Sequence, residues 1–299
     1  MYFTNYMKDI AIIGIGRWGK LLLKEFDVLS NIKYCHFLGN KKNQNWLRKN
    51  YPKIEIVKNI DDILKSNVEA IIIATPISTH FEISKKALQN NKHIFIEKPL
   101  ATSKKDALEL IKLGKKNNCF VFVGNIFLHH PVFKKIMKLT KNDPIQHANF
   151  YWNKTGTFKD DIFYNLLSHE LSIILEIFGN PLNSKILYSK GIISKIDQLI
   201  IEFNFNKNKK CLVNLNRISN FKNKSVLFKT KKKILLWENN KLFQFNQKNL
   251  KYDLIFTSKN EPLKIECKEF LRSINSRNLS LDTSYTVIQI LDDLTKKIS

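Results

Sequence analysis

The amino-acid sequence predicts an α/β protein in two parts, a doubly wound domain with a parallel sheet and then an α+β domain with an open, mostly antiparallel sheet. Two observations favour this division. The first 125 residues alternate short apolar runs with helical patterns, which is typical of repeated βαβ units. Beyond Pro131, strand-like runs follow one another with few helices between them. We therefore expect domains at residues 1–125 and 126–299, with final helices that can pack back on the first domain.

The expected elements of the first domain follow from the positions of its apolar residues. A helix at residues 19–29 carries Leu22, Leu23, Phe26 and Leu29 along one face. Continuous apolar runs predict six strands, at residues 9–14, 34–38, 55–57, 70–74, 93–96 and 120–123. Helical spacing predicts further helices at residues 60–65, 79–89 and 104–116. Strands that are apolar throughout fit a sheet covered on both faces.

The second domain is expected to be built from consecutive antiparallel strands framed by helices. Alternating apolar residues predict strands at residues 186–188, 199–205, 211–216, 226–229, 234–237 and 242–245. One helix is expected at residues 162–178, where it ends at Gly179. The last stretch, residues 263–298, is interpreted as two helices broken near residues 278–282.

A glycine-rich turn lies between the first expected strand and the first expected helix. Its sequence is Gly14-Ile15-Gly16-Arg17-Trp18-Gly19. In such a GxGxxG turn the first glycine allows a tight turn, the second lets the backbone approach a pyrophosphate, and the third lets helix and strand pack closely. The free N–H groups of the helix then face the anion. The sequence thus predicts a Rossmann domain whose turn binds a dinucleotide, and a purely structural turn is the alternative.

The residues after the second strand bear on the choice between NAD and NADP. An acidic residue about twenty residues beyond the turn holds the ribose hydroxyl of NAD. This chain has Gly39-Asn40-Lys41-Lys42 instead, with no carboxylate to repel a 2′-phosphate. We expect Asn40 and Lys41 to contact the cofactor and favour NADP. The alternative is that these lysines belong to the general lysine excess.

Several motifs in one order resemble the glucose–fructose oxidoreductase and inositol dehydrogenase (Gfo/Idh/MocA) family. They are Gly14 to Gly19, Ala74-Thr75-Pro76 with His80, Glu97-Lys98-Pro99, Val123-Gly124-Asn125 and Leu128 to Pro131. The resemblance covers nearly the whole chain and is closest to members that oxidise sugars, including nucleotide-linked ones. Besides the glycine-rich turn, it implies that the cofactor contacts Thr75, Pro76, His80, Glu97, Lys98 and Asn125.

The resemblance gives Lys98 a catalytic role beside the nicotinamide. Because Lys98 precedes a proline, its backbone is biased toward an extended conformation that ends the strand. Its ammonium group would donate to a substrate oxygen and stabilise the alkoxide that develops as hydride leaves. Taken alone, Lys98 would be interpreted as one surface lysine among many. Its position between a strand and Pro99, in register with the other motifs, favours the catalytic interpretation.

The family's acid/base pair lies on a helix of the second domain, where an aspartate precedes a histidine by four residues. The matching residues here are Asn165 and His169, which helical spacing places with Ser172 on one polar stripe. The opposite, buried side is expected to hold Phe163, Leu167, Leu171, Ile174 and Phe178. His169 would remove the proton from a substrate hydroxyl. A histidine on a helix is more often structural, and that alternative stays open.

Asn165 departs from the family, because an amide orients a hydroxyl but cannot accept its proton. Three outcomes are open: Lys98 and His169 suffice, a nearby carboxylate replaces the missing one, or catalysis is lost. The candidate carboxylates are Glu170, Asp160 and Asp161. The glycine-rich turn that relatives carry between strands of the second sheet is also replaced, by residues 229–233 (Lys-Thr-Lys-Lys-Lys).

The net charge of +24, from 50 Lys and Arg against 26 Asp and Glu, raises the question of nucleic acid. Only five of these basic residues are arginines, and the lysines are scattered, so we expect solvated lysines and no nucleic-acid partner. The four cysteines are far apart and lie in apolar segments. They are expected to be buried thiols, and no metal site is expected.

These observations predict an NAD(P)-dependent oxidoreductase that moves hydride between the cofactor and a ring hydroxyl of a sugar or nucleotide sugar. The alternative is an impaired family member that binds dinucleotide or sugar as a sensor or partner subunit. No apolar run approaches the roughly eighteen residues of a membrane span, and residues 1–10 lack a secretion signal, so we expect a cytoplasmic protein. The resemblance implies a homodimer or homotetramer formed through the second sheet, on a face that carries Leu199, Ile201, Phe203, Phe205, Leu212 and Leu215. Packing of that face under the framing helices is the alternative.

Overall fold

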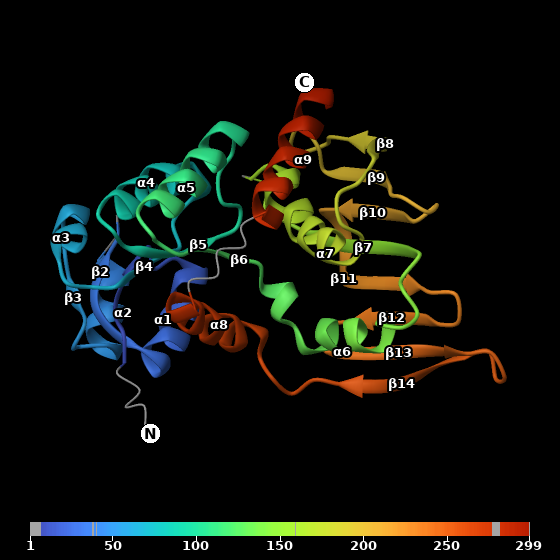
Figure 1. Cartoon of the computed structure of the whole chain (residues 1–299), viewed down its shortest axis with the longest axis horizontal. Coiled ribbons are helices and arrows are strands. Elements are labelled where there is room, and N and C mark those ends of the chain that lie inside the picture. The colour runs from blue at the N-terminus through green and yellow to red at the C-terminus, as the bar shows by residue number, and fades with distance from the viewer. Residues whose placement is uncertain (1–6, 38, 40, 159, 277–281, 299) are drawn as a thin grey trace. The chain divides into compact units, whose positions relative to one another are not determined.

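The chain folds into two compact units (Figure 1), which we call the first and second unit. A computed structural model describes residues 7–298 except 38, 40, 159 and 277–281. The first unit consists of Met1–Asn125 with Leu263–Asp292, and the second of Ile126–Pro262 with Asp293–Ser299. Each unit has its own sheet and its own buried apolar core.

The first unit contains a six-stranded sheet in which every pair of neighbours is parallel. The strand order is β3-β2-β1-β4-β5-β6, so the order reverses between β1 and β4. The strands are β1 (Asp9–Ile13), β2 (Asn31–His36), β3 (Glu55–Ile56), β4 (Ala70–Ile73), β5 (His93–Glu97) and β6 (Val121–Gly124). In sheets of this kind, ligands bind at the carboxyl ends of the strands beside such a reversal.

Helices cover both faces of this sheet. They are α1 (Arg17–Leu29), α2 (Lys41–Asn50), α3 (Ile60–Lys65), η1 (Ile77–Thr79), α4 (His80–Gln89), α5 (Lys104–Lys116) and α8 (Pro262–Ser276). Figure 1 shows α4 and α5 together on one face and α1 with α8 on the other. The ring of Phe270 in α8 lies 6.0 Å from that of Phe26 in α1 and 5.6 Å from that of Phe95 in β5. A helix from the end of the chain thus completes the core of the first unit.

The predicted α/β fold class is confirmed, and most predicted elements of the first unit are present within a few residues of their expected bounds. Helix α2 was not predicted. Its sequence, KKNQNWLRKN, contains almost no apolar residues, and Leu47 is its one fully buried side chain. A helix with so small a buried face leaves no apolar period to detect. Of the expected strand at residues 34–38, residue 38 lies outside the described residues.

The second unit contains an eight-stranded sheet in the order β14-β13-β12-β11-β7-β10-β9-β8. Its strands are β7 (His147–Thr155), β8 (Asn183–Lys190), β9 (Gln198–Asn204), β10 (Lys210–Asn216), β11 (Ile218–Lys229), β12 (Ile234–Glu238), β13 (Lys241–Asn246) and β14 (Lys251–Thr257). Its helical segments are η2 (Ile126–His129), α6 (Pro131–Thr140), η3 (Phe163–Leu167) and α7 (Ser168–Phe178). The last helix of the chain is α9 (Asp282–Ile298), which begins beside the expected break, of which residues 278–281 lie outside the described ones.

The expectation of strands that pair consecutively is wrong at one place. Strands β10 and β11 are not neighbours, because β7 lies between them. β7 pairs with β10 in parallel and with β11 in antiparallel orientation, so the sheet is mostly rather than wholly antiparallel. Neither β7 nor β14 was predicted. β14 is an edge strand with almost every side chain exposed, so its sequence lacks the alternation that burial on one face produces.

The face of the second sheet that was expected to be free for pairing is covered within the chain. Leu199, Ile201, Phe203 and Leu215 are fully buried there. The Phe205 ring at the end of the same row stacks on Phe178 of α7 at 4.9 Å. The covering by a framing helix, weighed as the alternative, is therefore what the structure has. Leu212 points to the opposite face and is half-buried.

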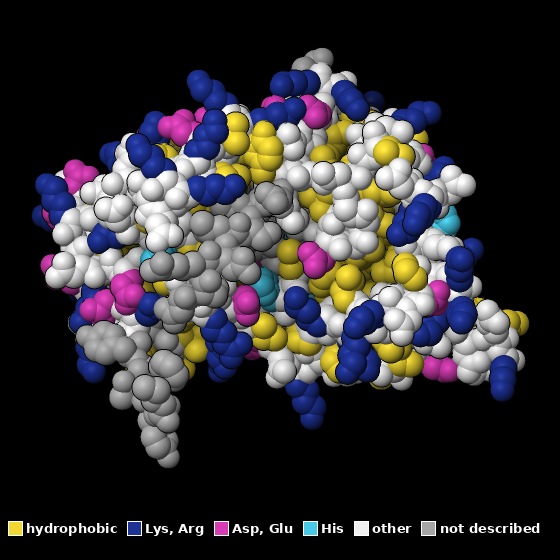
Figure 2. Space-filling view, viewed as in Figure 1, with side chains coloured by type: hydrophobic (Ala, Val, Ile, Leu, Met, Phe, Trp, Pro, Cys, Tyr) yellow, Lys and Arg dark blue, Asp and Glu magenta, His cyan; other side chains and the backbone are white. Residues whose placement is uncertain are grey.

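The distribution of charged side chains and the state of the cysteines are those that the sequence predicts. Lysine and arginine side chains spread over the face shown in Figure 2, with acidic side chains among them. The four cysteines are buried, unpaired thiols, as predicted; they are Cys35, Cys119, Cys211 and Cys267. Within the described residues, none of the helices combines the length and the apolar character that crossing a bilayer requires.

Candidate functional site

The glycine-rich turn of the first unit has the geometry that its sequence predicts. Gly14 has a φ of +96°, which side chains disfavour, and a Cβ there would lie 2.5 Å from the carbonyl oxygen of Ala74. A Cβ on Gly19 would collide with the carbonyl oxygen of Gly14. Gly16 differs, because apart from its chain neighbours no atom of the described residues lies within 4 Å of where its Cβ would be. Two glycines therefore permit close packing, and the middle one faces open space where a ligand can approach the backbone.

The start of α1 fits an anionic group. Gly16 is its N-cap and supplies no side chain to bond the first N–H groups, and the first turn contains no acidic residue. These N–H groups carry the positive end of the helix dipole. A pyrophosphate against Gly16 would accept hydrogen bonds from them. The residues present thus fit a dinucleotide.

Other predicted residues of the first unit follow the ends of parallel strands and so share an edge with the turn. Thr75 and Pro76 come after β4, Glu97 and Lys98 end or follow β5, and Asn125 follows β6. The Lys98–Pro99 peptide bond is cis. The structure therefore brings these residues to the carboxyl edge beside β1.

Glu97 is a carboxyl group in a protected position at this edge. It accepts a hydrogen bond from Trp18 Nε1 of the glycine-rich turn. Gly124 faces it across the β5–β6 ladder, and a Cβ on Gly124 would lie 3.3 Å from Glu97 Oε1. Burial raises the pKa of Glu97 to about 7, although the bond from Trp18 and the positive charge of Lys98 oppose the shift. Burial also raises the pKa of Glu266 in α8, and the Glu97 carboxylate adds to that rise.

His80 has a structural environment. It is 1% exposed, and its Nδ1 and Nε2 lie 2.9 and 3.0 Å from the carbonyl oxygens of Pro99 and Thr75. Burial lowers the pKa of His80, and the Lys98 charge acts in the same direction. The imidazole joins the loops that follow β4 and β5, so it shapes the edge rather than presenting a free ring nitrogen to a ligand.

The predicted cofactor residues after β2 are described only in part. Asn40 lies outside the described residues. Lys41 begins α2, and both Lys41 and Lys42 are exposed. In the described part of the chain, no group of three His, Cys, Asp or Glu side chains is arranged to hold a metal ion.

The predicted acid/base residues of the second unit lie on a helix that begins irregularly. Residues 163–167 form a π-turn, η3, which continues into α7. Single π-turns are frequent at functional sites. Asn165 lies in this turn, and His169 lies at the start of α7; both are half-buried.

The faces expected for this helix differ from the structure at two positions, one on the polar stripe and one on the opposite side. Ser172 is buried and donates to the carbonyl oxygen of His169 at 2.7 Å. Phe178, expected in the core, is half-buried. Helix α7 is buried on most sides, and the preceding π-turn breaks the regular helical period on which the prediction was based.

The three candidate carboxylates near Asn165 have different surroundings. Glu170 is buried and lies 2.7 Å from the ammonium group of Lys224. Asp161 accepts a hydrogen bond from the backbone N–H of Phe163 at 2.7 Å and so caps the helical segment. Asp160 is exposed, and its Oδ2 accepts a hydrogen bond from Asn165 Nδ2 at 3.2 Å. Of the three, Asp160 is the carboxylate in contact with the Asn165 side chain.

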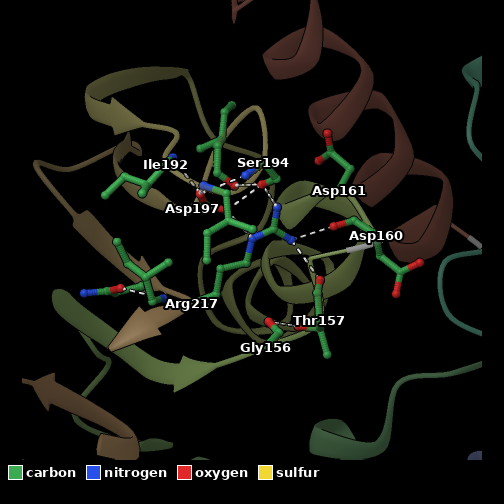
Figure 3. Close-up of polar contacts among 12 residues, drawn as sticks. Gly156, Thr157, Asp160, Asp161, Ile192, Ser194, Asp197 and Arg217 are labelled. Atoms are coloured by element: carbon green, nitrogen blue, oxygen red, sulfur yellow. Dashed lines mark hydrogen bonds and ion pairs between the residues drawn. The ribbon is translucent and has the colours of Figure 1, made fainter. Parts of the chain in front are cut away.

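A buried arginine holds the loop that carries Asp160 (Figure 3). Arg217 is 2% exposed, and its Nη1 donates to the carbonyl oxygens of Thr157 and Asp160 at 3.1 and 2.5 Å. Its Nε donates to Asp197 Oδ1 at 3.2 Å, and its Nη2 donates to Ser194 Oγ. The guanidinium therefore ties the backbone before η3 to the turn between β8 and β9.

Asp197 is the fixed counter-charge of this anchor. Its Oδ2 accepts hydrogen bonds from the backbone N–H groups of Ile192, Ile193 and Ser194 at 2.7, 2.6 and 3.0 Å. Burial favours the neutral acid, but these bonds and the one from the Ser194 hydroxyl hold the pKa of Asp197 well below its usual range.

Two functional candidates, Arg217 and Lys224, were not predicted from the sequence. Both continue the inward-facing alternation of a strand: Arg217, at the bend directly after β10, follows Val213 and Leu215, and Lys224 on β11 precedes Val226. A charged residue in register with buried apolar ones is a signal that strand periodicity offers. In a chain with 50 basic residues, the charge alone would not have drawn attention to either.

Comparison with known proteins agrees with these features. Residues 8–125 match the model of the GFO_IDH_MocA oxidoreductase family with an NAD-binding Rossmann fold. UDP-N-acetylglucosamine 3-dehydrogenase of Acidithiobacillus ferrooxidans is 26% identical over 46% of this chain and 44% of its own length. The scyllo-inositol 2-dehydrogenase (NADP(+)) IolW of Bacillus subtilis is 21% identical over 58% of this chain and 52% of its own. The matched region spans about half the length of the curated relatives.

The fold likeness extends over both units. The structure of the A. ferrooxidans UDP-N-acetylglucosamine 3-dehydrogenase superposes with a TM-score of 0.87 at 17% identity and covers 95% of each chain. That of myo-inositol 2-dehydrogenase from Lactobacillus plantarum gives a TM-score of 0.82 at 16% identity and covers 98% and 97%. Residues 8–125 thus match the NAD-binding Rossmann domain of the Gfo/Idh/MocA oxidoreductase family, and the fold is like that of the two solved dehydrogenases over both units.

Proposed function

We propose that this protein is an NAD(P)-dependent oxidoreductase that transfers hydride between the nicotinamide and a ring hydroxyl of a sugar or nucleotide sugar. The observation that carries the proposal is the glycine-rich turn, in which Gly14 and Gly19 permit close packing while Gly16 faces open space at the start of α1. The nicotinamide, when bound, supplies the hydride acceptor or donor. The chain's own residues have to bind the cofactor, orient the substrate and move the proton.

Lys98 and His169 are the catalytic residues of this proposal. Lys98 follows β5 at the carboxyl edge that also carries the turn, and its ammonium group would stabilise negative charge on the substrate oxygen. His169 would accept the hydroxyl proton during oxidation and return it during reduction. The assignment of both roles rests on the family resemblance of their sequence motifs.

Asp160 supplies the carboxylate in our proposal. Its contact with Asn165 Nδ2 supports this role, because it places negative charge beside the amide that stands at the family's aspartate position. Glu170 and Asp161 are less suitable, since one is buried against Lys224 and the other caps the helix. Asn165 then orients the substrate hydroxyl, and Asp160 provides the charge that an amide lacks.

We further propose that NADP is preferred over NAD. Exposed Lys41 and Lys42 at the start of α2 support this, because a 2′-phosphate would pair with them and no acidic residue stands in the first turn of α2. A relative whose name specifies NADP(+) adds support. The substrate class is supported by relatives named as dehydrogenases of a UDP-linked sugar and of inositol.

The test combines cofactor binding with turnover. Purified protein is titrated with NADPH and NADH while cofactor fluorescence is followed, and turnover is measured with UDP-N-acetylglucosamine, other UDP-sugars, inositols and free sugars. Tighter binding of NADPH and oxidation or reduction of one of these compounds supports the proposal. If neither cofactor binds, the proposal is wrong. If a cofactor binds, no compound reacts and Asn165→Asp creates turnover, the protein is the impaired binding member considered as the alternative.

We also propose that copies of this chain pair through the face of the second sheet opposite α7. Half-buried apolar side chains on that face support pairing; they are Ile200, Leu212, Leu227 and Leu236. Apolar area left on a sheet face favours association. Light scattering of the wild type and of Leu212→Lys tests this, and a monomeric wild type contradicts it.

A further inference from the structure

The second unit contains a half-buried lysine, Lys224, whose buried ammonium group lies against a carboxylate and two aromatic faces. Lys224 Nζ lies 2.7 Å from Glu170 Oε1. The same nitrogen lies 3.5 Å from the ring centroid of Phe127 and 3.6 Å from that of Trp152. We call Lys224, Glu170, Phe127 and Trp152 the lysine cage.

The backbone explains how the cage forms. Lys224 on β11 and Trp152 on β7 are directly opposite each other in the antiparallel ladder. Both belong to the row that contains buried Leu215, so both side chains point to the face covered by helices. Helix α7 brings Glu170 to this face, and η2 brings Phe127. The cage is thus assembled from four separate elements of the second unit.

The two aromatic rings of the cage also flank His169. The His169 ring centroid lies 5.2 Å from that of Phe127, nearly perpendicular at 81°, and 5.6 Å from that of Trp152 at 46°. Glu170, the counter-ion of Lys224, directly follows His169 in α7. The ammonium group is therefore linked to the imidazole in two ways, through the shared rings and through the helix backbone.

The lysine cage orients side chains more than it stabilises the fold. Burial lowers the pKa of Lys224 to about 8, although Glu170 opposes that shift. Burial also raises the pKa of Glu170, whose Oε2 has no hydrogen-bond partner among the residues described. A buried ion pair with unmet hydrogen bonds is commonly no more stable than apolar residues of the same volume. What an ammonium group adds that a methyl group cannot is attraction to the faces of both rings at once.

We propose that Lys224 is a positioning residue for His169, because its ammonium group, held by Glu170, fixes Phe127 and Trp152 in the orientation that flanks the imidazole. This inference rests on the proposed function in assigning the proton transfer to His169. The arrangement of rings around His169 does not depend on that assignment, so it can be tested separately.

The experiment measures the His169 ring directly. The imidazole resonances are recorded by NMR in histidine-labelled protein and assigned with His169→Gln. Lys224→Met removes the charge and keeps the length of the side chain. Because the rings of Phe127 and Trp152 shift nearby resonances through their ring currents, we expect Lys224→Met to move the His169 signals. Lys222→Met, on the same strand but exposed, is the matched control and should leave them in place.

A second variant keeps the test decisive if Lys224→Met fails to fold with Glu170 left alone. Lys224→Met with Glu170→Gln removes both charges at nearly constant volume. We expect it to fold, to show displaced His169 signals, and to have a kcat about 10–100-fold lower at unchanged KM for the cofactor. Wild-type His169 signals in either folded variant would overturn the inference. If the wild type turns over no substrate, the proposed function fails, but the NMR result still tests whether Lys224 positions the rings around His169.

Discussion

The second unit contains two ion pairs, one fully buried and one with a half-buried lysine, that stabilise their charges in different ways. Arg217 and Asp197 are 2% and 0% exposed, and hydrogen bonds satisfy both: the guanidinium has four oxygen partners, and the carboxylate accepts three backbone N–H groups. Lys224 and Glu170 are 17% and 1% exposed and rely on one ion pair and two ring faces. The first pair organises backbone, whereas the second organises side chains.

The partners of each ion pair determine which part of the structure it can hold in place. Hydrogen bonds to ionised groups are strong and directional, so Arg217 can hold the loop before η3 in one place. Ring faces attract a cation with less directionality, so Lys224 constrains ring planes rather than backbone. The two pairs lie near the two residues of the proposed acid/base group: Arg217 binds the loop that carries Asp160, and Lys224 binds the rings around His169.

The largest expected effect comes from breaking the arginine anchor. Arg217→Met leaves Asp197 charged, buried and without its cation, which costs about 3–5 kcal/mol in the free energy of unfolding. Urea denaturation measures this, with exposed Arg48→Met as control. A loss below about 1 kcal/mol would mean that Arg217 behaves like a surface residue and that the comparison is wrong.

Removing both charges of a pair should affect the free energy of unfolding differently in the two ion pairs. Lys224→Met with Glu170→Gln is expected to cost less than either single change, because no lone buried charge remains. Arg217→Met with Asp197→Leu should stay strongly destabilised, because the N–H groups of residues 192–194 lose their acceptor at about 1–3 kcal/mol each. Double-mutant cycles in urea give both values. Equal recovery in the two cycles would show that the pairs do not differ in kind.

The first unit contains two carboxyl groups, Glu97 and Glu266, whose pKa values burial raises. The pKa of Glu97 is raised to about 7 from 4.5, so the folded protein binds a proton there that the unfolded chain releases. Stability from this group is present below about pH 4.5 and is lost as the pH rises toward 7. Glu97→Gln should flatten this fall by up to about 1.4 kcal/mol per pH unit. Exposed Glu82→Gln is the control, and an unchanged slope in Glu97→Gln contradicts the assignment.

The smallest effect is expected where a charge is exposed. Asp160→Asn should lower kcat by about 10–100-fold through loss of the carboxylate beside Asn165, with a change in unfolding free energy within about 0.5 kcal/mol. Asp161→Asn removes a charge one residue away while an asparagine can still cap the helix, so it should leave kcat nearly unchanged. Steady-state kinetics of the two variants checks the difference. Equal losses would remove Asp160 from the proposed site.

Sequence patterns predict the first unit well because its chemistry is local. Strand, glycine-rich turn and helix follow one another between Asp9 and Leu29. The surroundings of each glycine in the turn explain separately why a glycine fits there. The second unit depends on contacts between distant residues. That Arg217 binds the carbonyl group of Asp160, or that Lys224 lies between two rings, follows from the insertion of β7 between β10 and β11. No local period encodes that order, and the π-turn before α7 further shifts the faces that helical spacing predicts.

The proposed function requires that this chain moves hydride at a site that uses Lys98. The most direct measurement follows absorbance of the reduced cofactor with the panel of nucleotide sugars and inositols, for the wild type and for Lys98→Met. We expect at least one compound to react, and we expect Lys98→Met to retain cofactor binding but to lose about 10²–10³-fold in kcat. A wild type that binds cofactor yet reacts with no compound, or a Lys98→Met variant as active as the wild type, would contradict the proposed function.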